Sequence, residues 1–280
     1  MKISVLINTL NEEKNIANCL ETVKWADEII IVDMYSKDKT VEIAKKYTDK
    51  IFFFKKMRYA DPARQFALEK VSNEWILVID ADELVPIALR DKLIQIMEND
   101  LGDVIYIPHS NYFFGSLIKG LGWGPLQNPH PRFFKKEFIN FSGEIHNFFI
   151  INDAARIYNI TDPAESFIHF SYVDVEHFIE KMNRYTTIEA ENLYEKGQTI
   201  RIRGLMFNII RYEFINRYIT LNGRKDGFRG ISIILLMAMY RTLVYMKLKL
   251  MERYNSKNVE KKINEDYKKI ALNYIAEYKK

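Results

Sequence analysis

The chain has 280 residues, of which 48% are hydrophobic, enough for a large folded core and too many for a wholly disordered protein. Its net charge of +4 is modest and no dense basic stripe stands out, so we expect no nucleic acid among its partners. The single cysteine, Cys19, excludes a disulfide within the chain and a thiolate metal site. The apolar stretch at the N-terminus ends at Asn8, too short for a signal peptide, so we expect a cytoplasmic protein.

Four short apolar runs in the first part of the chain are rich in β-branched and aromatic side chains, which is typical of strands buried on both faces. They cover residues 3–7, 29–32, 51–54 and 75–79. Helical patterns separate them, since apolar residues recur three and four apart in 16–23, and Asp61 with Pro62 is typical of a helix start. This alternation predicts an α/β domain with a mostly parallel sheet, whose ligands bind beyond the carboxyl ends of the strands.

The pattern changes after Pro108. Aromatic residues, glycine, proline and histidine mix through residues 109–150, which predicts loops and short strands of the kind that recognise a ligand. Trp123, between two glycines, is suited either to stacking on a sugar ring or to filling the core beneath a glycine turn. From Val173 the pattern is helical to the end, so we expect an α/β domain over 1–170 and a helical extension over 171–280.

Two carboxylates, Asp80 and Asp82, stand two apart directly after the fourth apolar run. Carboxylates held close together repel each other, and a divalent cation between them removes this cost. Mg²⁺ and Mn²⁺ favour such oxygen ligands and share them with substrate phosphates. The spacing alone fits a metal site and a solvated acidic turn equally well, because short acidic patterns are common.

Polar residues also follow the first two apolar runs. Asp33, at the end of the second run, is suited to accept hydrogen bonds from a base or a ribose hydroxyl. The serine, aspartate and threonine that come next favour turn and helix-cap roles. After the first run, Thr9 or Asn11 is suited to cap a helix, and Glu12 to favour its dipole, which does not exclude contact with a ligand.

Four motifs occur in order along the chain. Three follow expected strands, and the third of the four lies on the expected helix before the fourth strand. They are Thr9-Leu10-Asn11-Glu12, Val32-Asp33-x-x-Ser36-x-Asp38-x-Thr40, Ala63-Arg64-Gln65-x-Ala67-Leu68 and Asp80-Ala81-Asp82-Glu83. Together they resemble family 2 glycosyltransferases of the GT-A fold, most of all the small bacterial β-glycosyltransferases that add a hexose to the lipopolysaccharide core or to similar envelope glycans. The resemblance covers about residues 1–150, and the stretch from Ile168 to Tyr185 is similar to the same subgroup.

The resemblance implies a donor site for a nucleotide-sugar, which we expect to be a UDP-sugar. A metal ion, Mn²⁺ or Mg²⁺, would offset the charge that develops on the leaving nucleoside diphosphate, and an arginine suits bidentate contact with phosphate. The metal side of the site would be formed by Asp82 and Asp80. The nucleoside and diphosphate side would be formed by Thr9, Asn11, Glu12, Asp33, Arg64, Asp80 and Ala81.

Inverting transfer requires one general base that takes a proton from the acceptor hydroxyl. Relatives in this subgroup commonly have His-Glu where this chain has His146 and Asn147, and Asn cannot act as a base. Glu144 is therefore the first candidate, although it fits a surface strand equally well. His146 is suited to catalysis, to metal binding or to acceptor contact, and Asp153 is a distant third candidate base. His169, between two apolar residues, fits a hydrogen-bonded core histidine.

The segment 227–251 is apolar and rich in methionine, with cations scattered around it. It fits a helix in the membrane interface whose cations contact anionic lipids, and equally a buried packing helix or an interface in a homo-oligomer. Its longest uncharged stretch, 231–240, ends at Arg241 and is shorter than the roughly 18–20 apolar residues needed to span a bilayer. We therefore expect any membrane contact to be peripheral, on the cytoplasmic face of the inner membrane.

These features together favour an inverting, metal-dependent hexosyltransferase that acts on a hydroxyl of a cell-envelope glycan or lipid-linked acceptor. Two alternatives remain open. A nucleotidyltransferase would also use strand-end carboxylates with a metal, but the loop after the first apolar run is acidic and lacks glycine. A non-catalytic sugar-nucleotide-binding protein of the same fold is supported only by the asparagine at position 147.

Overall fold

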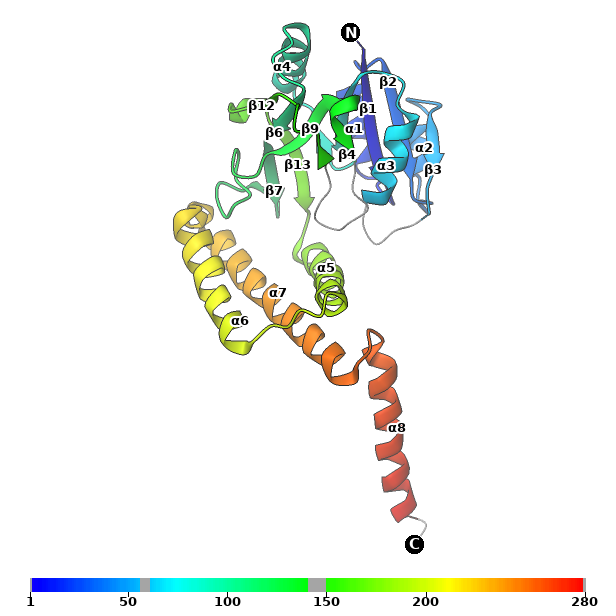
Figure 1. Cartoon of the computed structure of the whole chain (residues 1–280), viewed down its shortest axis with the longest axis vertical. Coiled ribbons are helices and arrows are strands. Elements are labelled where there is room, and N and C mark those ends of the chain that lie inside the picture. The colour runs from blue at the N-terminus through cyan, green and yellow to red at the C-terminus, as the bar shows by residue number, and fades with distance from the viewer. Residues whose placement is uncertain (1, 56–60, 141–149, 279–280) are drawn as a thin grey trace. The chain divides into compact units, whose positions relative to one another are not determined.

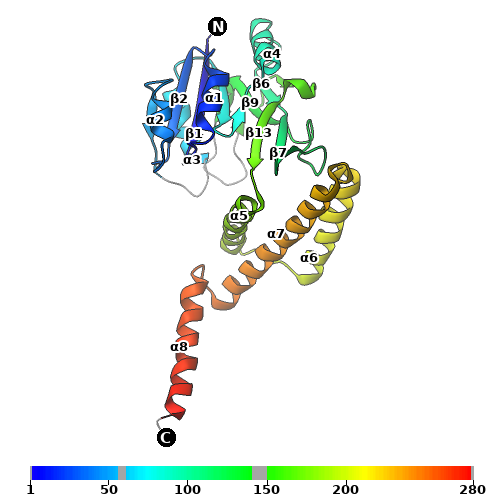
Figure 2. The ribbon, with the colours of Figure 1, turned by 180° about the vertical axis from the view of Figure 1, so that it is seen from behind.

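The computed structural model describes residues 2–55, 61–140 and 150–278. By its internal contacts the chain divides into two compact units, Met1–Val173 and Asp174–Lys280 (Figure 1, Figure 2). The first unit mixes strands and helices, and the second contains helices in its described part. The predicted α/β fold with a helical C-terminal extension is therefore confirmed.

The first unit contains a seven-stranded sheet with a mostly parallel centre. Its strands, in spatial order, are β12 (Ile157–Asn159), β6 (Val104–Ile107), β9 (His130–Lys135), β4 (Trp75–Asp80), β1 (Ile3–Thr9), β2 (Glu28–Asp33) and β3 (Ile51–Phe53). The four strands β4, β1, β2 and β3 run parallel, whereas β9 runs antiparallel between β4 and β6. The four predicted strands are thus present, and three of them end on a polar residue of the motifs.

A second, smaller sheet lies in the same unit and includes Glu83–Leu84, directly after Asp82, as one of its strands. It consists of β5 (Glu83–Leu84), β13 (Phe167–Tyr172), β7 (His109–Phe113) and β8 (Ser116–Leu117), in that order. Two further short strands, β10 (Ile139–Asn140) and β11 (Ile150–Ile151), pair with each other. The prediction of loops and short strands after Pro108 holds for the described residues of this region.

Helices cover both faces of the main sheet, which explains why its strands are apolar without alternation. On one face, Leu6, Ile30 and Ile76 pack with the helix α3, and on the other, residues such as Ile7 and Leu77 pack with α1 and α4. The helices of this unit are α1 (Ile16–Val23), α2 (Thr40–Ala44), α3 (Asp61–Lys70) and α4 (Ile87–Glu98), with short 3₁₀ turns at Lys136–Phe138 and Pro163–Glu165.

The second unit is a set of helices with a small core of its own. They are α5 (Val175–Glu195), α6 (Ile202–Asn208), the π-helical segment η3 (Ile209–Thr220), the 3₁₀ turn η4 (Gly223–Asp226), α7 (Gly227–Tyr254) and α8 (Val259–Glu277). Asp174 caps α5 by accepting a hydrogen bond from the backbone N–H of His177 at 2.8 Å. The core joins α5 to α7 through Ala190, Val244, Leu248 and Met251.

The expectation that the apolar stretch of this unit is too short to span a bilayer was wrong. The helical stretch Gly223–Tyr254 is long and apolar enough to cross a membrane by length and composition, with a mean hydropathy of 1.5 over its most apolar window. Only 22% of that window is buried inside the protein. The uncharged run 231–240 gave too short a length for the apolar stretch, because apolar residues continue in the same helix beyond Arg241.

Candidate active site

The polar ends of three neighbouring strands meet at one edge of the main sheet. In the register of the parallel pairs, Thr9 of β1 lies opposite Asp33 of β2, and Asn8 of β1 lies opposite Asp80 of β4. Ligands of open parallel sheets bind at this carboxyl edge. The two amide atoms of Asn8 and the hydroxyl of Thr9 are buried and make no hydrogen bond within the described residues. Buried polar atoms of this kind call for a partner beyond the described residues, and a bound ligand is one that suits this edge.

The loops after β1 and β2 are tied together at this edge by side-chain to backbone hydrogen bonds. Asp33 is fully buried, and its two oxygens accept from the N–H and the hydroxyl of Ser36, at 2.8 and 2.5 Å. The Ser36 hydroxyl in turn accepts from the backbone N–H of Asn11, and the Asn11 side chain accepts from the N–H of Lys37, both at 2.8 Å. The backbone N–H of Glu12 donates to the Thr40 hydroxyl at 2.7 Å. Asp33 and Asn11 thus shape the edge by fixing the two loops.

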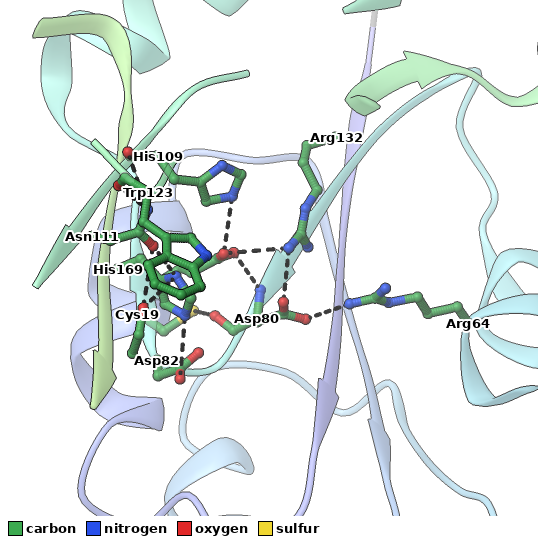
Figure 3. Close-up of polar contacts among 11 residues, drawn as sticks. Cys19, Arg64, Asp80, Asp82, His109, Asn111, Trp123, Arg132 and His169 are labelled. Atoms are coloured by element: carbon green, nitrogen blue, oxygen red, sulfur yellow. Dashed lines mark hydrogen bonds and ion pairs between the residues drawn. The ribbon is translucent and has the colours of Figure 1, made fainter. Parts of the chain in front are cut away.

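Asp80, at the end of β4, accepts one hydrogen bond from each of two arginines, as Figure 3 shows. Arg64 of α3 and Arg132 of β9 each place Nη2 at 2.8 Å from one oxygen of this carboxylate. Burial opposes the ionised form of Asp80, but the two guanidinium charges outweigh it and hold the pKa of this carboxyl well below its usual range. The carboxylate is therefore ionised at neutral pH and fixed in orientation.

Glu83 closes the turn that carries the motif. Its buried carboxylate accepts from the backbone N–H of Asp80 at 2.8 Å and lies 3.3 Å from Nη2 of Arg132 and 3.2 Å from Nε2 of His109. Burial raises the pKa of Glu83, yet the charge of Arg132 outweighs it and lowers the pKa to about 2. The buried Glu83 carboxylate, paired with the buried Arg132, therefore fixes the backbone of the turn.

Asp82, on the same turn, lies beside a histidine of β13. Its Oδ2 is 3.6 Å from Nε2 of His169. The other ring nitrogen, Nδ1, lies 2.8 Å from Oδ1 of Asn111. The Asn111 amide nitrogen donates to the carbonyl oxygen of Trp123 at 2.8 Å, which orients the amide so that its oxygen accepts from the ring (Figure 3). The Ser171 hydroxyl lies 2.9 Å from the same Nδ1, and Nε2 on the far side of the ring faces the Asp82 carboxylate.

A ring nitrogen that faces a carboxylate oxygen can share either a proton or a cation with it. Burial lowers the pKa of His169, but its interactions with the carboxylates of Asp82 and Glu83 outweigh burial and raise the pKa above its usual value. His169 is thus hydrogen-bonded, as the sequence suggested, but half-buried and turned toward the carboxylate motif. No group of three or more His, Cys, Asp or Glu side chains is arranged to hold a metal within 2–55, 61–140 and 150–278.

Residues 4–156, more than half of the chain, match the family model described as glycosyl transferase family 2. The chain belongs to this family. It is 30% identical over 287 residues to an uncharacterised glycosyltransferase of Rickettsia conorii, with 95% of each chain covered. It is 27% identical over 258 residues to the lipopolysaccharide core biosynthesis glycosyltransferase LpsC of Rhizobium meliloti, covering 89% of this chain and 92% of LpsC. Among solved structures, residues 1–349 of S. aureus TarS match with a TM-score of 0.48 and 20% identity, over 96% of this chain and 92% of that one.

The predicted membership of glycosyltransferase family 2 is thus confirmed. The two residues expected to take part in catalysis, Glu144 and His146, lie outside the described residues. Asp153, the third candidate base, lies exposed in the turn after β11. Trp123 is half-buried, and its ring lies 5.5 Å from that of Phe113 between centroids. Both interpretations of this tryptophan stay open.

Sequence reasoning did not single out three side chains near this edge of the sheet. Arg132 lies on β9, more than fifty residues after the motif whose Asp80 it contacts, and no local pattern marks it. Asn111 orients His169 from another strand of the small sheet. Tyr35, directly after β2, has a left-handed backbone with φ of 61° and is 61% exposed. Such a conformation is costly for a bulky residue.

Proposed function

We propose that this family 2 enzyme moves a hexose, with inversion, from a nucleotide-sugar to a hydroxyl of a cell-envelope glycan or lipid-linked acceptor, assisted by Mn²⁺ or Mg²⁺. The observation that carries the proposal is the turn Asp80–Asp82 at the carboxyl edge of the sheet. There two arginines hold one carboxylate, and a histidine ring nitrogen faces the other. This is a place for a diphosphate and its cation.

The residues around Asp82 fit a divalent cation. Asp82 supplies a carboxylate oxygen and His169 a ring nitrogen, both ligands that Mn²⁺ accepts. Asn111 orients the ring through its far nitrogen, which is the usual support of a metal-binding histidine. The bound cation would neutralise charge on the departing nucleoside diphosphate. We assign Asp82 and His169 to it; Asp80 and His146 stay predicted ligands.

The arginine pair is suited to the diphosphate. Arg132 donates through Nη2 to Asp80, while its Nη1 is buried and makes no hydrogen bond among the described residues. Guanidinium groups donate to phosphate in a planar fork, so this second nitrogen is available to a phosphate oxygen. In this proposal Asp80 fixes Arg64 and Arg132 in place. Its predicted contact with the nucleoside is a second role.

The nucleoside would occupy the edge between β1 and β2. The unsatisfied atoms of Asn8 and Thr9 supply both donors and acceptors for a base or ribose. Tyr35 stacks on Phe53 at 5.4 Å between ring centroids, which leaves the exposed tyrosine suited to cover a base. Glu12, another predicted contact of the nucleoside, lies in the adjoining loop. As before, we expect the donor to be a UDP-sugar.

The acceptor class rests on the relative. LpsC is a lipopolysaccharide core glycosyltransferase by name, and the chains align over most of their lengths. We extend an envelope-glycan acceptor to this chain on that basis. Glu144 remains the first candidate for the base that deprotonates the acceptor hydroxyl, with His146 beside it.

Asp82→Asn tests the proposal most directly. The wild-type protein is incubated with a panel of nucleotide-sugars and Mn²⁺ or Mg²⁺, and release of nucleoside diphosphate is measured. We expect Asp82→Asn to lower the metal-dependent rate by about 100-fold or more, because the cation loses a charged ligand. Asp91→Asn, an exposed aspartate of α4 paired with Arg90, is the matched control and should retain the rate.

The same assay separates the alternatives. Family membership favours glycosyl transfer over nucleotidyl transfer, and formation of pyrophosphate from a nucleoside triphosphate would reverse that preference. A protein that binds nucleotide-sugars, as seen by a rise in Tm, but turns none over would be the non-catalytic alternative. Undiminished metal-dependent turnover in Asp82→Asn would remove the metal assignment and leave the family intact.

A further inference from the structure

Neighbouring helices of the helical unit expose many large apolar side chains, here together called the hairpin surface. It is formed by α6 and η3, which follow one another, and by α7, which packs against η3 and lies beside them in both views (Figure 1, Figure 2). The most exposed members are Phe228 of α7, at 73%, and Ile219 of η3, at 59%. The other members are Ile202, Met206, Phe207, Ile210, Phe214, Ile215, Ile231, Leu235, Met239 and Met246.

Helix α7 is apolar on two opposite faces, and the protein covers only one of them. Ile233, Ile234, Val244, Leu248 and Met251 are buried. The exposed members follow each other at spacings of three, four and seven residues, which places them on one stripe away from the buried face. They are Phe228, Ile231, Leu235, Met239 and Met246. The burial of α7 within this unit therefore leaves a second apolar face to be covered from outside.

The charge inside the hairpin is neutralised within the protein. Glu213 of η3 is fully buried, accepts from Nε of Arg217 at 2.6 Å and pairs with Nε of Arg241 of α7. Arg241 is the residue that interrupts the apolar run of α7, and it stands seven positions after the buried Ile234, on the covered side of the helix. The one charge in the middle of α7 is thus turned away from the exposed stripe and paired.

The segment that carries the hairpin surface is strongly basic. Residues 201–254 contain eleven lysines and arginines against three acidic residues, a net charge of +8, whereas the whole chain has +4. Arg201 directly precedes α6, Arg203 lies in its first turn, and Arg224 and Lys225 lie in η4; all four are exposed. An apolar face bordered by cations complements an anionic lipid surface, and two copies facing each other through it would bring like charges together.

We propose that the hairpin surface docks the protein on an anionic lipid bilayer, with α6, η3 and α7 lying in the interface. The apolar stripe enters the acyl boundary, and the flanking cations contact lipid phosphates. Arg211 lies exposed on η3, with its guanidinium over the rings of Phe207 and Tyr212, which suits the headgroup level rather than the bilayer centre. This inference does not depend on the sugar chemistry of the first unit.

Vesicle flotation of the full chain tests the proposal. The vesicles are phosphatidylcholine alone or a mixture with phosphatidylglycerol, at low and high salt. We expect binding to the anionic mixture, weaker binding to phosphatidylcholine, and loss with salt. Ile231→Glu with Leu235→Glu should lower binding at least tenfold. Ile87→Glu with Leu101→Glu, the same two changes at exposed positions of the first unit, should leave it unchanged.

The contribution of the cations is tested separately. Arg224→Gln with Lys225→Gln should weaken binding to anionic vesicles by about fivefold per cation. Lys45→Gln with Lys46→Gln, two exposed lysines of the first unit, removes the same charge elsewhere and should have little effect. Circular dichroism and Tm of each variant confirm folding.

Three outcomes would overturn the proposal. They are wild-type protein that does not float with anionic vesicles, flotation that the Ile231 and Leu235 changes do not reduce, and a wild-type dimer that these changes dissociate while vesicles remain unbound. The last result, read by light scattering, would assign the hairpin surface to a second copy of this chain. Donor turnover measured in solution is unaffected in each case, so a failure here is distinct from a failure of the proposed function.

Discussion

Arg132 contacts two of the three carboxylates on the turn Asp80–Glu83, namely Asp80 and Glu83. It lies 3.3 Å from Glu83 and donates to Asp80; Arg132 and Glu83 are buried, and Asp80 is half-buried. A buried pair of this kind adds little net stability when intact, but removing one partner leaves a charge without compensation. The arrangement therefore favours a fixed geometry of the turn over stability as such.

We predict that Arg132→Met lowers the free energy of unfolding by about 3 kcal/mol, because Glu83 and Asp80 lose the cation between them. Urea unfolding followed by circular dichroism measures it. Arg90→Met serves as the control, since its pair with Asp91 is exposed and should contribute under about 1 kcal/mol. Equal losses in the two variants would contradict a special role for Arg132.

His169 and Asn111 provide a second prediction at the residue scale. His169→Ala should weaken Mn²⁺ binding by about 10- to 100-fold, and Asn111→Leu should weaken it less, because Asn111 acts only by orienting the ring. Titration calorimetry with Mn²⁺ and a nucleoside diphosphate measures both without any turnover. Affinities equal to the wild type in both variants would remove His169 from the cation site.

At the scale of the strand, the apolar runs predicted β1 to β4 because helices cover both faces of the sheet, so burial left a continuous signal. The carboxyl-edge position of Thr9, Asp33 and Asp80 followed from parallel pairing alone. The small sheet could not be predicted in the same way, because β5 and β8 have only two residues each. A strand that short has no period to detect.

The same limit explains what was missed in the site. Arg132 and His169 reach the turn through strand pairing across gaps of about fifty and ninety residues, which one sequence does not encode locally. Asp33 was predicted to be a ligand because it ends a strand, but whether its oxygens face a ligand or Ser36 depends on the loop conformation. Residue type and position were predictable at this edge, whereas the partner of each side chain was not.

At the opposite edge of the main sheet, Glu28 ties the start of three strands together. Its buried carboxylate pairs with Ser4 of β1 and with Lys50 before β3, and accepts from the N–H of Ser72 before β4 at 3.0 Å. Burial raises the pKa of Glu28, but the hydrogen bonds from Lys50 and Ser4 outweigh it and lower the pKa to about 2. This carboxylate stabilises the sheet only while it is ionised.

A group whose pKa is lowered by folding contributes stability above its unfolded pKa and loses it as the pH falls through the folded pKa. We therefore predict that the contribution of Glu28, on the order of 2 kcal/mol, is present at pH 7 and declines between pH about 5 and about 2. Tm measured across this range should fall less steeply for Glu28→Gln than for wild type. Glu98→Gln, at the exposed end of α4, should reproduce the wild-type slope. Parallel slopes for wild type and Glu28→Gln would contradict the assignment.

At the scale of the whole molecule, charge is divided between the two units. The residues up to 173 carry a net charge of −4 and those from 174 carry +8, although the chain as a whole has only +4. An anionic membrane therefore attracts the helical unit at long range and repels the unit that carries Asp80 and Asp82. Both the charge division and the hairpin surface direct the same unit to the lipid.

This division predicts how salt affects transfer. With a lipid-linked acceptor in vesicles containing phosphatidylglycerol, raising NaCl from about 50 to about 300 mM should raise the apparent KM for the acceptor several-fold, because screening weakens docking. Turnover of the donor with water as acceptor should change little over the same range, since no docking is involved. Vesicles of phosphatidylcholine alone should show a high KM at every salt concentration. A salt effect equal in the vesicle and solution assays would place the charge dependence in the donor site instead, because only the donor site is common to both reactions.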